Sequence, residues 1–138
     1  MGCAQVTTPP LLDTHVWVWW IRHDPRLNET VVKHLDGFAS DERPFVADIS
    51  LWEVAMLVEK GKMDLPLPVD QWLASASDPR TVRVVPISAA IAAETQVARI
   101  LRDPADRLIV ATSRILRVPL FTKDRNILRS RLVERWVP

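Results

Sequence analysis

The sequence has little cysteine, little glycine and no long apolar run, and each shortage excludes a class of protein. Cys3 is the single cysteine, which excludes an internal disulfide and a cysteine-based metal site and is typical of a reducing compartment. The three glycines are isolated, so a glycine-rich phosphate-binding loop is absent. The longest apolar run, residues 16–21, is far too short to cross a bilayer, and the N-terminus has no signal-peptide pattern. We therefore expect a cytoplasmic protein without a membrane partner.

Length and composition predict one globular domain. With 138 residues, 48% of them hydrophobic and 25% charged, the chain is long enough to bury a core. We expect a single domain over residues 1–138, in which residues 1–9 form a flexible extension. The net charge of +1 hides an asymmetry, because residues 99–138 contain 10 Lys/Arg and only 4 Asp/Glu. Such a basic part can attract a polyanion, or can simply form solvated helix faces.

Strand-like and helix-like segments alternate along the chain without tight hairpin signals, which predicts a parallel α/β sheet with helices on both faces. Strands are predicted at residues 11–12, 43–50, 81–87, 119–122 and around 135–137. Helices are predicted over residues 14–21, from Asn28 to near Gly37, from a cap at Ser50 to Lys60, after residues 65–72, over residues 88–101, from Asp103 and Pro104 onward, and after Lys123.

Four acidic residues are expected at one edge of this sheet. Asp13 follows the first predicted strand, and Asp124 follows the strand at residues 119–122 by two positions. Glu53 and Asp106 each lie in the first turn of a predicted helix. Ligands of open α/β sheets bind beyond the carboxyl ends of the strands, where loops and helix N-termini meet. If these strands are neighbours, the four carboxylates converge.

Each acid also has a purely structural explanation. The sequence "SLWE" at residues 50–53 has the pattern of a capping box, in which Glu53 bonds back to the backbone of Ser50. Asp13 and Asp124 can each cap the next helix, where a negative charge is favoured, and Asp103 is also well explained as a cap. No single acid is therefore evidence of a site.

The set of four acids points to a bound cation. Converged carboxylates raise one another's pKa and weaken the fold, unless a hard divalent ion such as Mg²⁺ or Mn²⁺ neutralises them. His15, His23 and His34 do not have the spacing of zinc ligands. A divalent ion beside carboxylates favours phosphodiester hydrolysis. Thr14 and Thr122, which lie close to two of the acids, either orient carboxylates or the attacking water, or make local contacts with the backbone.

Four segments of the chain together resemble PIN-domain proteins, in particular the VapC-type toxins of toxin–antitoxin pairs. These segments are "LLDTHVWVWW", "ADISLWEVAMLVEKGKMDLP", "RDPADRLIVATSRILRVPLFTKD" and "VERWV", and the similarity extends from Leu11 to Val137. The resemblance implies a three-layer α/β/α fold, a Mg²⁺- or Mn²⁺-dependent ribonuclease, and inhibition by a cognate antitoxin.

The resemblance also implies roles for particular residues. It implies that the catalytic and metal-binding residues are Asp13, Glu53, Asp106 and Asp124. Asp103 matches a subgroup of the family, so we expect it, like Thr14 and Thr122, to support the site without binding the ion directly. The family further implies a homodimer whose acidic groove accepts a segment of the antitoxin.

The basic residues of the C-terminal part are candidates for guiding RNA phosphates: Arg102, Arg107, Arg114, Arg117, Lys123, Arg125, Arg129 and Arg131. Of these, Arg107 and Arg125 lie nearest to the acids in the sequence, so we name them as candidate RNA-binding residues. Unpaired RNA is the expected substrate, because an A-form duplex hides its base edges.

The chain has six tryptophans, which is many for its size. Aromatic side chains can stack on unpaired bases, but apolar helix stripes more often belong to a core or an interface. We therefore favour packing or protein contact for Trp17, Trp19, Trp20 and Trp52.

Two other classes of protein stay open. A receiver-like phosphoacceptor domain also has acids at strand ends, and Lys123 after Thr122 fits it superficially, although Asp13 has no second acid beside it. A metal-free binding module is the other alternative, in which the acids only cap helices.

Overall fold

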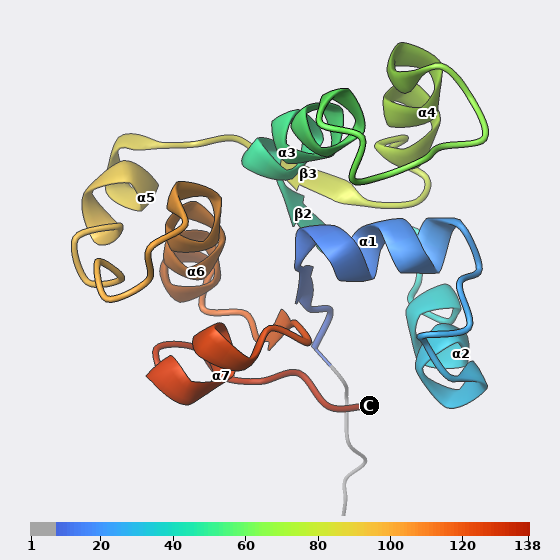
Figure 1. Cartoon of the computed structure of the whole chain (residues 1–138). Helices are drawn as coiled ribbons and strands as arrows, with labels where there is room; N and C mark the ends of the chain where they lie inside the picture. Colours follow the sequence, from blue (N-terminus) through green and yellow to red (C-terminus); the bar gives the residue numbers. More distant parts are fainter. Residues whose placement is uncertain (1–7) are drawn as a thin grey trace, which may run out of the picture.

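The computed structural model describes residues 8–138, which form a parallel sheet flanked by helices (Figure 1). The elements in chain order are β1 (Leu11–Leu12), α1 (Thr14–Ile21), α2 (Glu29–Asp36), β2 (Phe45–Ala47), α3 (Asp48–Glu59), α4 (Val69–Ala76), β3 (Arg83–Val85), α5 (Ala89–Glu94), α6 (Pro104–Leu116), β4 (Leu120–Phe121) and α7 (Arg125–Ser130). No helix of the described chain is both long and apolar enough to span a membrane.

The four strands lie in the order β3-β2-β1-β4, and all neighbours are parallel. β1 is central: Leu11 is in register with Phe45 and Leu120. The backbone N–H of Asp13 donates to the carbonyl of Phe121 at 3.0 Å, which ties the end of β1 to the end of β4. The residues that follow these two strands therefore lie side by side, although they are far apart in the sequence.

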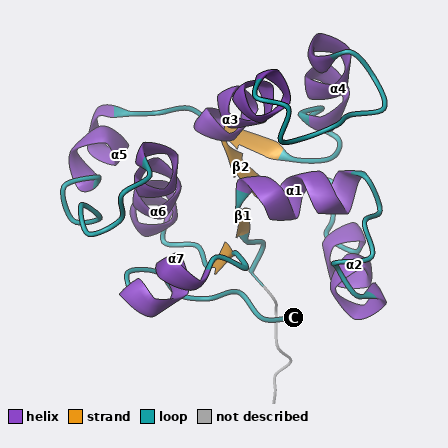
Figure 2. Cartoon of the chain, in the orientation of Figure 1, coloured by secondary structure: helices purple, strands orange, loops and turns teal. Residues whose placement is uncertain are grey.

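Alternating side chains of the strands build two separate cores on opposite faces of the sheet. Leu12 faces one core, which we call the tryptophan core because it contains Trp17, Trp20, Trp72 and Trp136. The other members of this core come from the strands, from helices α1 to α4 and from the segments between them. Leu11 faces the second core, which it forms with residues of α6, β4 and α7. Figure 2 shows helices on both sides of the strands. The predicted three-layer α/β/α fold with a parallel central sheet is confirmed.

Several element boundaries differ from the prediction. α3 begins at Asp48 and not after Ser50, because the strand ends at Ala47; no side-chain hydrogen bond caps this helix. The predicted stop at Gly61 is confirmed: the residue has a φ of +70°, a conformation that glycine adopts without strain, and its N–H donates to the carbonyl of Val58.

Two further predictions were wrong in extent: the helix over residues 88–101 and the last strand. α5 ends at Glu94, and the N–H groups of residues 95–98 and of Leu101 then donate to the carbonyl three residues earlier, which turns the chain. Ala98 and Leu101 of this turn are buried in the second core. Around residues 135–137 there is only an isolated bridge between Leu120 and Arg135.

The N-terminal extension was predicted over residues 1–9. Residues 1–7 lie outside the described part of the chain. Pro9 and Pro10 are buried, and the carbonyl of Pro10 accepts the N–H of Phe45 at 2.9 Å. Pro9, which was predicted within the extension, is therefore packed in the domain.

Candidate active site at the carboxyl edge of the sheet

A pocket of about 310 Å³ lies at the carboxyl edge of the sheet, and acidic side chains line most of it. We call it the acidic pocket. Its acids are Asp13 after β1, Glu53 in α3, Asp103 and Asp106 at the start of α6, and Asp124 before α7. The rest of the lining consists of His15, Val16, Trp19 and Lys123. The structure thus brings together the four acids that were predicted to converge, and adds Asp103.

Asp13 is the buried centre of this arrangement, with 7% of its surface exposed. One carboxylate oxygen accepts the N–H of Thr14 at 2.8 Å, and the other accepts the hydroxyl of Thr122 at 2.6 Å. Burial raises the pKa of Asp13, and the bonds from Thr122 and Thr14 oppose this rise by favouring the charged form. The two threonines therefore hold a buried carboxylate in one orientation.

Thr122 also connects Asp13 to Asp124, the acid that follows β4. Its hydroxyl oxygen accepts the backbone N–H of Asp124 at 3.0 Å while its proton goes to Asp13. Asp124 in turn accepts the N–H groups of Asn126 and Ile127 and so caps α7. The capping explanation of Asp124 is correct, and the residue nevertheless lines the acidic pocket.

Glu53 is held from α1 and not by a capping box. Its Oε1 accepts the hydroxyl of Thr14 at 2.6 Å, and Thr14 Oγ1 lies 2.8 Å from the hydroxyl of Ser50. A threonine hydroxyl has a single proton, so Ser50 is the donor to Thr14 while Glu53 is charged. Because α3 begins at Asp48, Glu53 lies in its second turn and not in the predicted first turn. The capping-box explanation of "SLWE" is wrong.

Asp103 and Asp106 share the N-terminus of α6. Asp103 caps the helix by accepting the N–H of Ala105 at 2.8 Å, and Pro104 follows it as predicted. The pKa of Asp106 is raised to about 8, first by burial and then by the negative charges of Asp13, Asp103, Asp124 and Glu53. Burial likewise raises the pKa of Glu53. Mutual repulsion among converged acids is thus present in the folded chain.

The donor set has the chemistry of a hard divalent-cation site. Within residues 8–138, no three carboxylate, imidazole or thiolate groups are already arranged to hold one ion. Mg²⁺ does not require three, since it usually binds one or two carboxylates and keeps several waters. A cation in the pocket would remove the repulsion that raises the pKa of Asp106. The residues present therefore fit such an ion.

The candidate RNA-binding arginines do not behave alike. Arg107 donates to the carbonyls of Leu101 and Arg99, so it fixes the loop before α6 and its guanidinium is already engaged. Arg125 is exposed in the first turn of α7 but does not line the acidic pocket. The prediction that Arg107 guides RNA is therefore not supported by its contacts.

A groove of about 710 Å³ adjoins the acidic pocket, because Asp103, Asp106 and Asp124 line both. Two exposed arginines, Arg102 and Arg129, line this groove. Its other lining residues are Ile100, Leu101, Asn126 and Ser130. Arg102 and Arg129 thus place positive charge beside the acids. Nothing in the sequence distinguishes these two arginines from the others; only their position in the fold does.

The tryptophans separate into different environments. Trp17 and Trp20 are buried, and their indole N–H groups donate to Ala76 O at 3.1 Å and to Asp36 Oδ1 at 2.9 Å. Their predicted packing is confirmed. Trp52 is 57% exposed, so contact of this ring with another protein stays a prediction. Trp19 packs partly against the tryptophan core and also lines the acidic pocket.

Two aromatic residues of the pocket, His15 and Trp19, were not predicted as site residues. They are four positions apart on α1 and so share one face of the helix that begins directly after Asp13. The short distance of His15 and Trp19 from Asp13 along the sequence could have identified them as residues near the site.

The strand order excludes the receiver-like alternative. Flavodoxin-like receivers have the strand order 2-1-3-4-5, in which β1 lies between β2 and β3. Here β1 lies between β2 and β4.

The family model of the PIN domain matches residues 11–131. The chain therefore belongs to the PIN-domain family. It is 39% identical over 124 residues to ribonuclease VapC22 of Mycobacterium tuberculosis (strain ATCC 25618 / H37Rv), a match that covers 87% of this chain and 90% of that relative. The resemblance to VapC-type PIN-domain toxins, first indicated by the four motifs, is confirmed.

Proposed function

We propose that this PIN-domain chain is a VapC-type endoribonuclease that hydrolyses phosphodiester bonds of unpaired RNA and requires Mg²⁺ or Mn²⁺. The observation that carries the proposal is the convergence of Asp13, Glu53, Asp106 and Asp124 in one pocket, with the pKa of Asp106 raised to about 8. Such an arrangement destabilises the fold unless a cation compensates it, which is typical of sites that act on phosphates.

These four acids are the proposed ligands of the ion, directly or through water. When bound, Mg²⁺ or Mn²⁺ supplies positive charge that stabilises the phosphate oxygens and makes a nearby water more acidic. Asp13 is held by Thr14 and Thr122, so it presents a fixed carboxylate. Asp103 adds negative charge from the cap of α6 and supports the neighbouring acids without being a required ligand.

The RNA strand is proposed to cross the acidic pocket and continue along the adjoining groove. Arg102 and Arg129 line that groove and can neutralise backbone phosphates, whereas Arg107 is engaged in the loop. Lys123 lines the acidic pocket itself and adds a positive charge beside the acids. A single strand is the better substrate, because its bases and backbone can adapt to a pocket of this size.

The proposed partners include a second copy of the chain and a cognate antitoxin that blocks the acidic pocket. A large apolar side chain on the surface supports a protein partner: Ile100 is 75% exposed. Ile100 also lines the groove beside the acids, so a partner that covers it would obstruct the path of the RNA. We place this activity in the cytoplasm, where the single cysteine of the chain stays reduced.

The test is cleavage of a mixed-sequence single-stranded RNA with Mn²⁺, with Mg²⁺ and with a chelator. We expect cleavage with either ion and none with the chelator. Asp13→Asn keeps the shape of the side chain but removes its charge, and we expect it to reduce kcat/KM at least about 100-fold, the usual effect of losing one electrostatic group of an active site.

The matched control is Asp70→Asn, since Asp70 is an exposed acid in the first turn of α4 and does not line the acidic pocket. This variant should cleave as the unchanged protein does. Cleavage that persists in the chelator, or equal rates for Asp13→Asn and Asp70→Asn, would contradict the proposal.

A further inference from the structure

One wall of the acidic pocket is aromatic and comes from α1. His15 and Trp19 line the pocket together with the acids, and their ring centroids lie 6.0 Å apart with the planes tilted by 53°. Trp19 is half-buried and His15 is exposed. Trp17 and Trp20 of the same helix are buried, so α1 directs two indoles into the core and a third toward the pocket.

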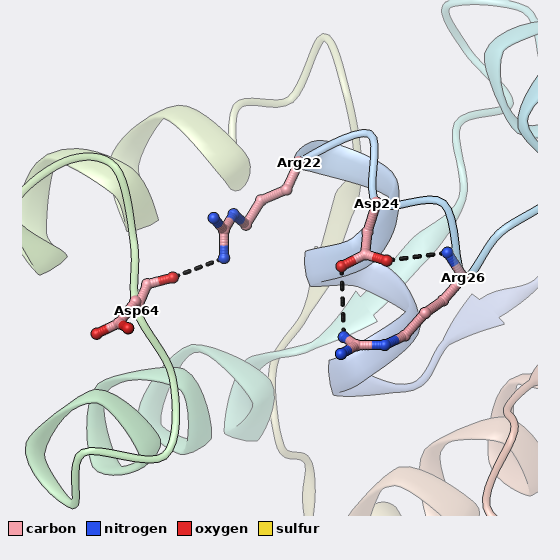
Figure 3. A network of polar contacts seen from close by, with 4 residues as sticks. All are labelled: Arg22, Asp24, Arg26 and Asp64. Atoms are coloured by element: carbon pink, nitrogen blue, oxygen red, sulfur yellow. Dashed lines mark hydrogen bonds and ion pairs between the residues drawn. The ribbon is translucent and has the colours of Figure 1, made fainter.

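A positive charge lies against the same aromatic wall. The guanidinium carbon of Arg26 is 5.4 Å from the centroid of the Trp19 ring. Asp24 holds Arg26 in place, because its carboxylate accepts the backbone N–H of Arg26 at 2.9 Å and a guanidinium N–H at 3.3 Å (Figure 3). In the same view Arg22 donates to the backbone carbonyl of Asp64, which anchors the end of α1 to the segment after α3.

The chemistry of this wall matches that of a nucleotide. An indole face stacks on any unpaired base without a requirement for sequence, and a guanidinium against the ring adds a cation–π contact. The scissile phosphate must lie at the carboxylates, so the base of a neighbouring nucleotide is the part of an RNA strand nearest to Trp19. A role in packing alone does not require Trp19 to line the pocket, as the buried positions of Trp17 and Trp20 demonstrate.

We propose that Trp19, with His15, forms a stacking surface for an unpaired base next to the scissile phosphate, with Arg26 held by Asp24 against the Trp19 ring. This inference rests on the proposed ribonuclease function and specifies how that site positions its substrate. Trp19 is thus a positioning residue, and it acts on the affinity for RNA more than on the chemical step.

The test compares Trp19→Ala and Trp19→Phe with Trp52→Ala. Trp52 is the control because it is an exposed tryptophan of α3 that does not line the acidic pocket. On a mixed-sequence single-stranded RNA whose cleavage site has been mapped, we expect Trp19→Ala to raise KM about 5- to 100-fold, the range for losing one stacked base, while kcat changes less than about 3-fold. Trp19→Phe should recover most of the loss, and Trp52→Ala should have no effect.

RNAs with a single abasic nucleotide on either side of the cleavage site show whether the lost contact is stacking. The effect of Trp19→Ala should disappear on one of these RNAs, because the base that Trp19 contacts is already missing. Equal KM values for Trp19→Ala and Trp52→Ala, or a loss that is the same on every abasic RNA, would overturn the inference. Equal KM values for the two variants would instead favour contact of the aromatic wall with a protein partner.

Binding of the same fluorescein-labelled RNAs, measured by anisotropy without added divalent ion, separates this inference from the proposed function. If the unchanged protein cleaves while Trp19→Ala binds and cleaves equally well, the stacking inference fails and the ribonuclease proposal stands. If the unchanged protein does not cleave RNA but binds it in a Trp19-dependent way, the ribonuclease proposal fails and the stacking inference stands. Absence of any RNA binding would overturn the inference.

Discussion

The tryptophan core and the acidic pocket meet at two consecutive residues of the chain. Leu12 is fully buried in the tryptophan core, while Asp13 turns a buried carboxylate toward the pocket. The core removes apolar surface from water and so stabilises the fold. The pocket gathers acids whose burial and mutual repulsion raise their pKa, which destabilises the fold. Stability and the proposed activity are thus divided between adjacent regions that share β1 and α1.

The largest expected effect lies on the core side. Trp17 is fully buried, its N–H donates to the carbonyl of Ala76, and its ring centroid lies 5.5 Å from that of Trp72. We expect Trp17→Ala to lower the free energy of unfolding by about 3–5 kcal/mol, since it removes a large buried side chain and leaves a cavity. Urea denaturation measures this change. Trp52→Ala should stay within about 0.5 kcal/mol of the unchanged protein, and similar losses in both variants would contradict the comparison.

An intermediate effect is expected where the two regions join. Thr122 is fully buried, and its hydroxyl bridges the N–H of Asp124 and the carboxylate of Asp13. Thr122→Val leaves both groups without this partner, and we expect a loss of about 1–3 kcal/mol in the free energy of unfolding. Thr122→Ser keeps the hydroxyl and should lose less.

The pH dependence identifies the cause of that loss. The hydroxyl of Thr122 stabilises charged Asp13, so the difference between Thr122→Val and Thr122→Ser should grow as the pH rises and Asp13 ionises. A difference that does not depend on pH would mean that the hydrogen bond to Asp13 does not determine the effect, and that the bond from the Asp124 N–H or packing of the methyl groups does.

The smallest effect is expected for Asp106→Asn, which should stabilise the folded chain, whereas the changes above destabilise it. The pKa of Asp106 is raised from 3.8 to about 8 in the folded chain, so the folded state binds a proton more tightly than the unfolded state does. Without a divalent ion, stability should therefore fall as the pH rises from about 4 to about 8. Asp106→Asn cannot ionise, and we expect its melting temperature to exceed that of the unchanged protein by a few degrees at pH 8 and to match it near pH 4.

Added Mn²⁺ completes this test. It should raise the melting temperature of the unchanged protein more at pH 8 than at pH 5, and should have less effect on Asp106→Asn, because the ion competes with protons for the same carboxylates. Asp70→Asn should respond as the unchanged protein does. A melting temperature of Asp106→Asn below that of the unchanged protein at pH 8 would show that Asp106 stabilises the pocket instead.

The sequence alone predicts the sheet and the four acids because their signals are local. Each strand is a short apolar segment between helix-forming segments, and Pro104 and Gly61 mark where a helix begins or ends. The acids follow from the rule that residues after parallel strands meet at one edge. The family resemblance adds the chemistry, which no single one of these acids could have established.

What the sequence did not predict depends on contacts between distant segments. Ser50 matches a cap by its position, yet it bonds to Thr14 because α1 and α3 pack together. Arg107 and Arg129 are alike in the sequence, and only the loop before α6 determines that the first is engaged while the second lines the groove. Likewise, helical spacing predicts that Trp19 and His15 share one face of α1. It does not predict that this face lines the acidic pocket.

The hydrogen bond between Thr122 and Asp13 joins residues 109 positions apart, and the same bridge holds Asp124. Asp13 is among the first residues of the domain to leave a ribosome, whereas β4 emerges only when most of the domain has been made. Until β4 docks against β1, Asp13 lacks the partner that orients it and the pocket lacks Asp124. On the proposed function, a chain that ends before Thr122 lacks both the hydrogen-bond partner that orients Asp13 and the carboxylate of Asp124, so we expect it to have no nuclease activity.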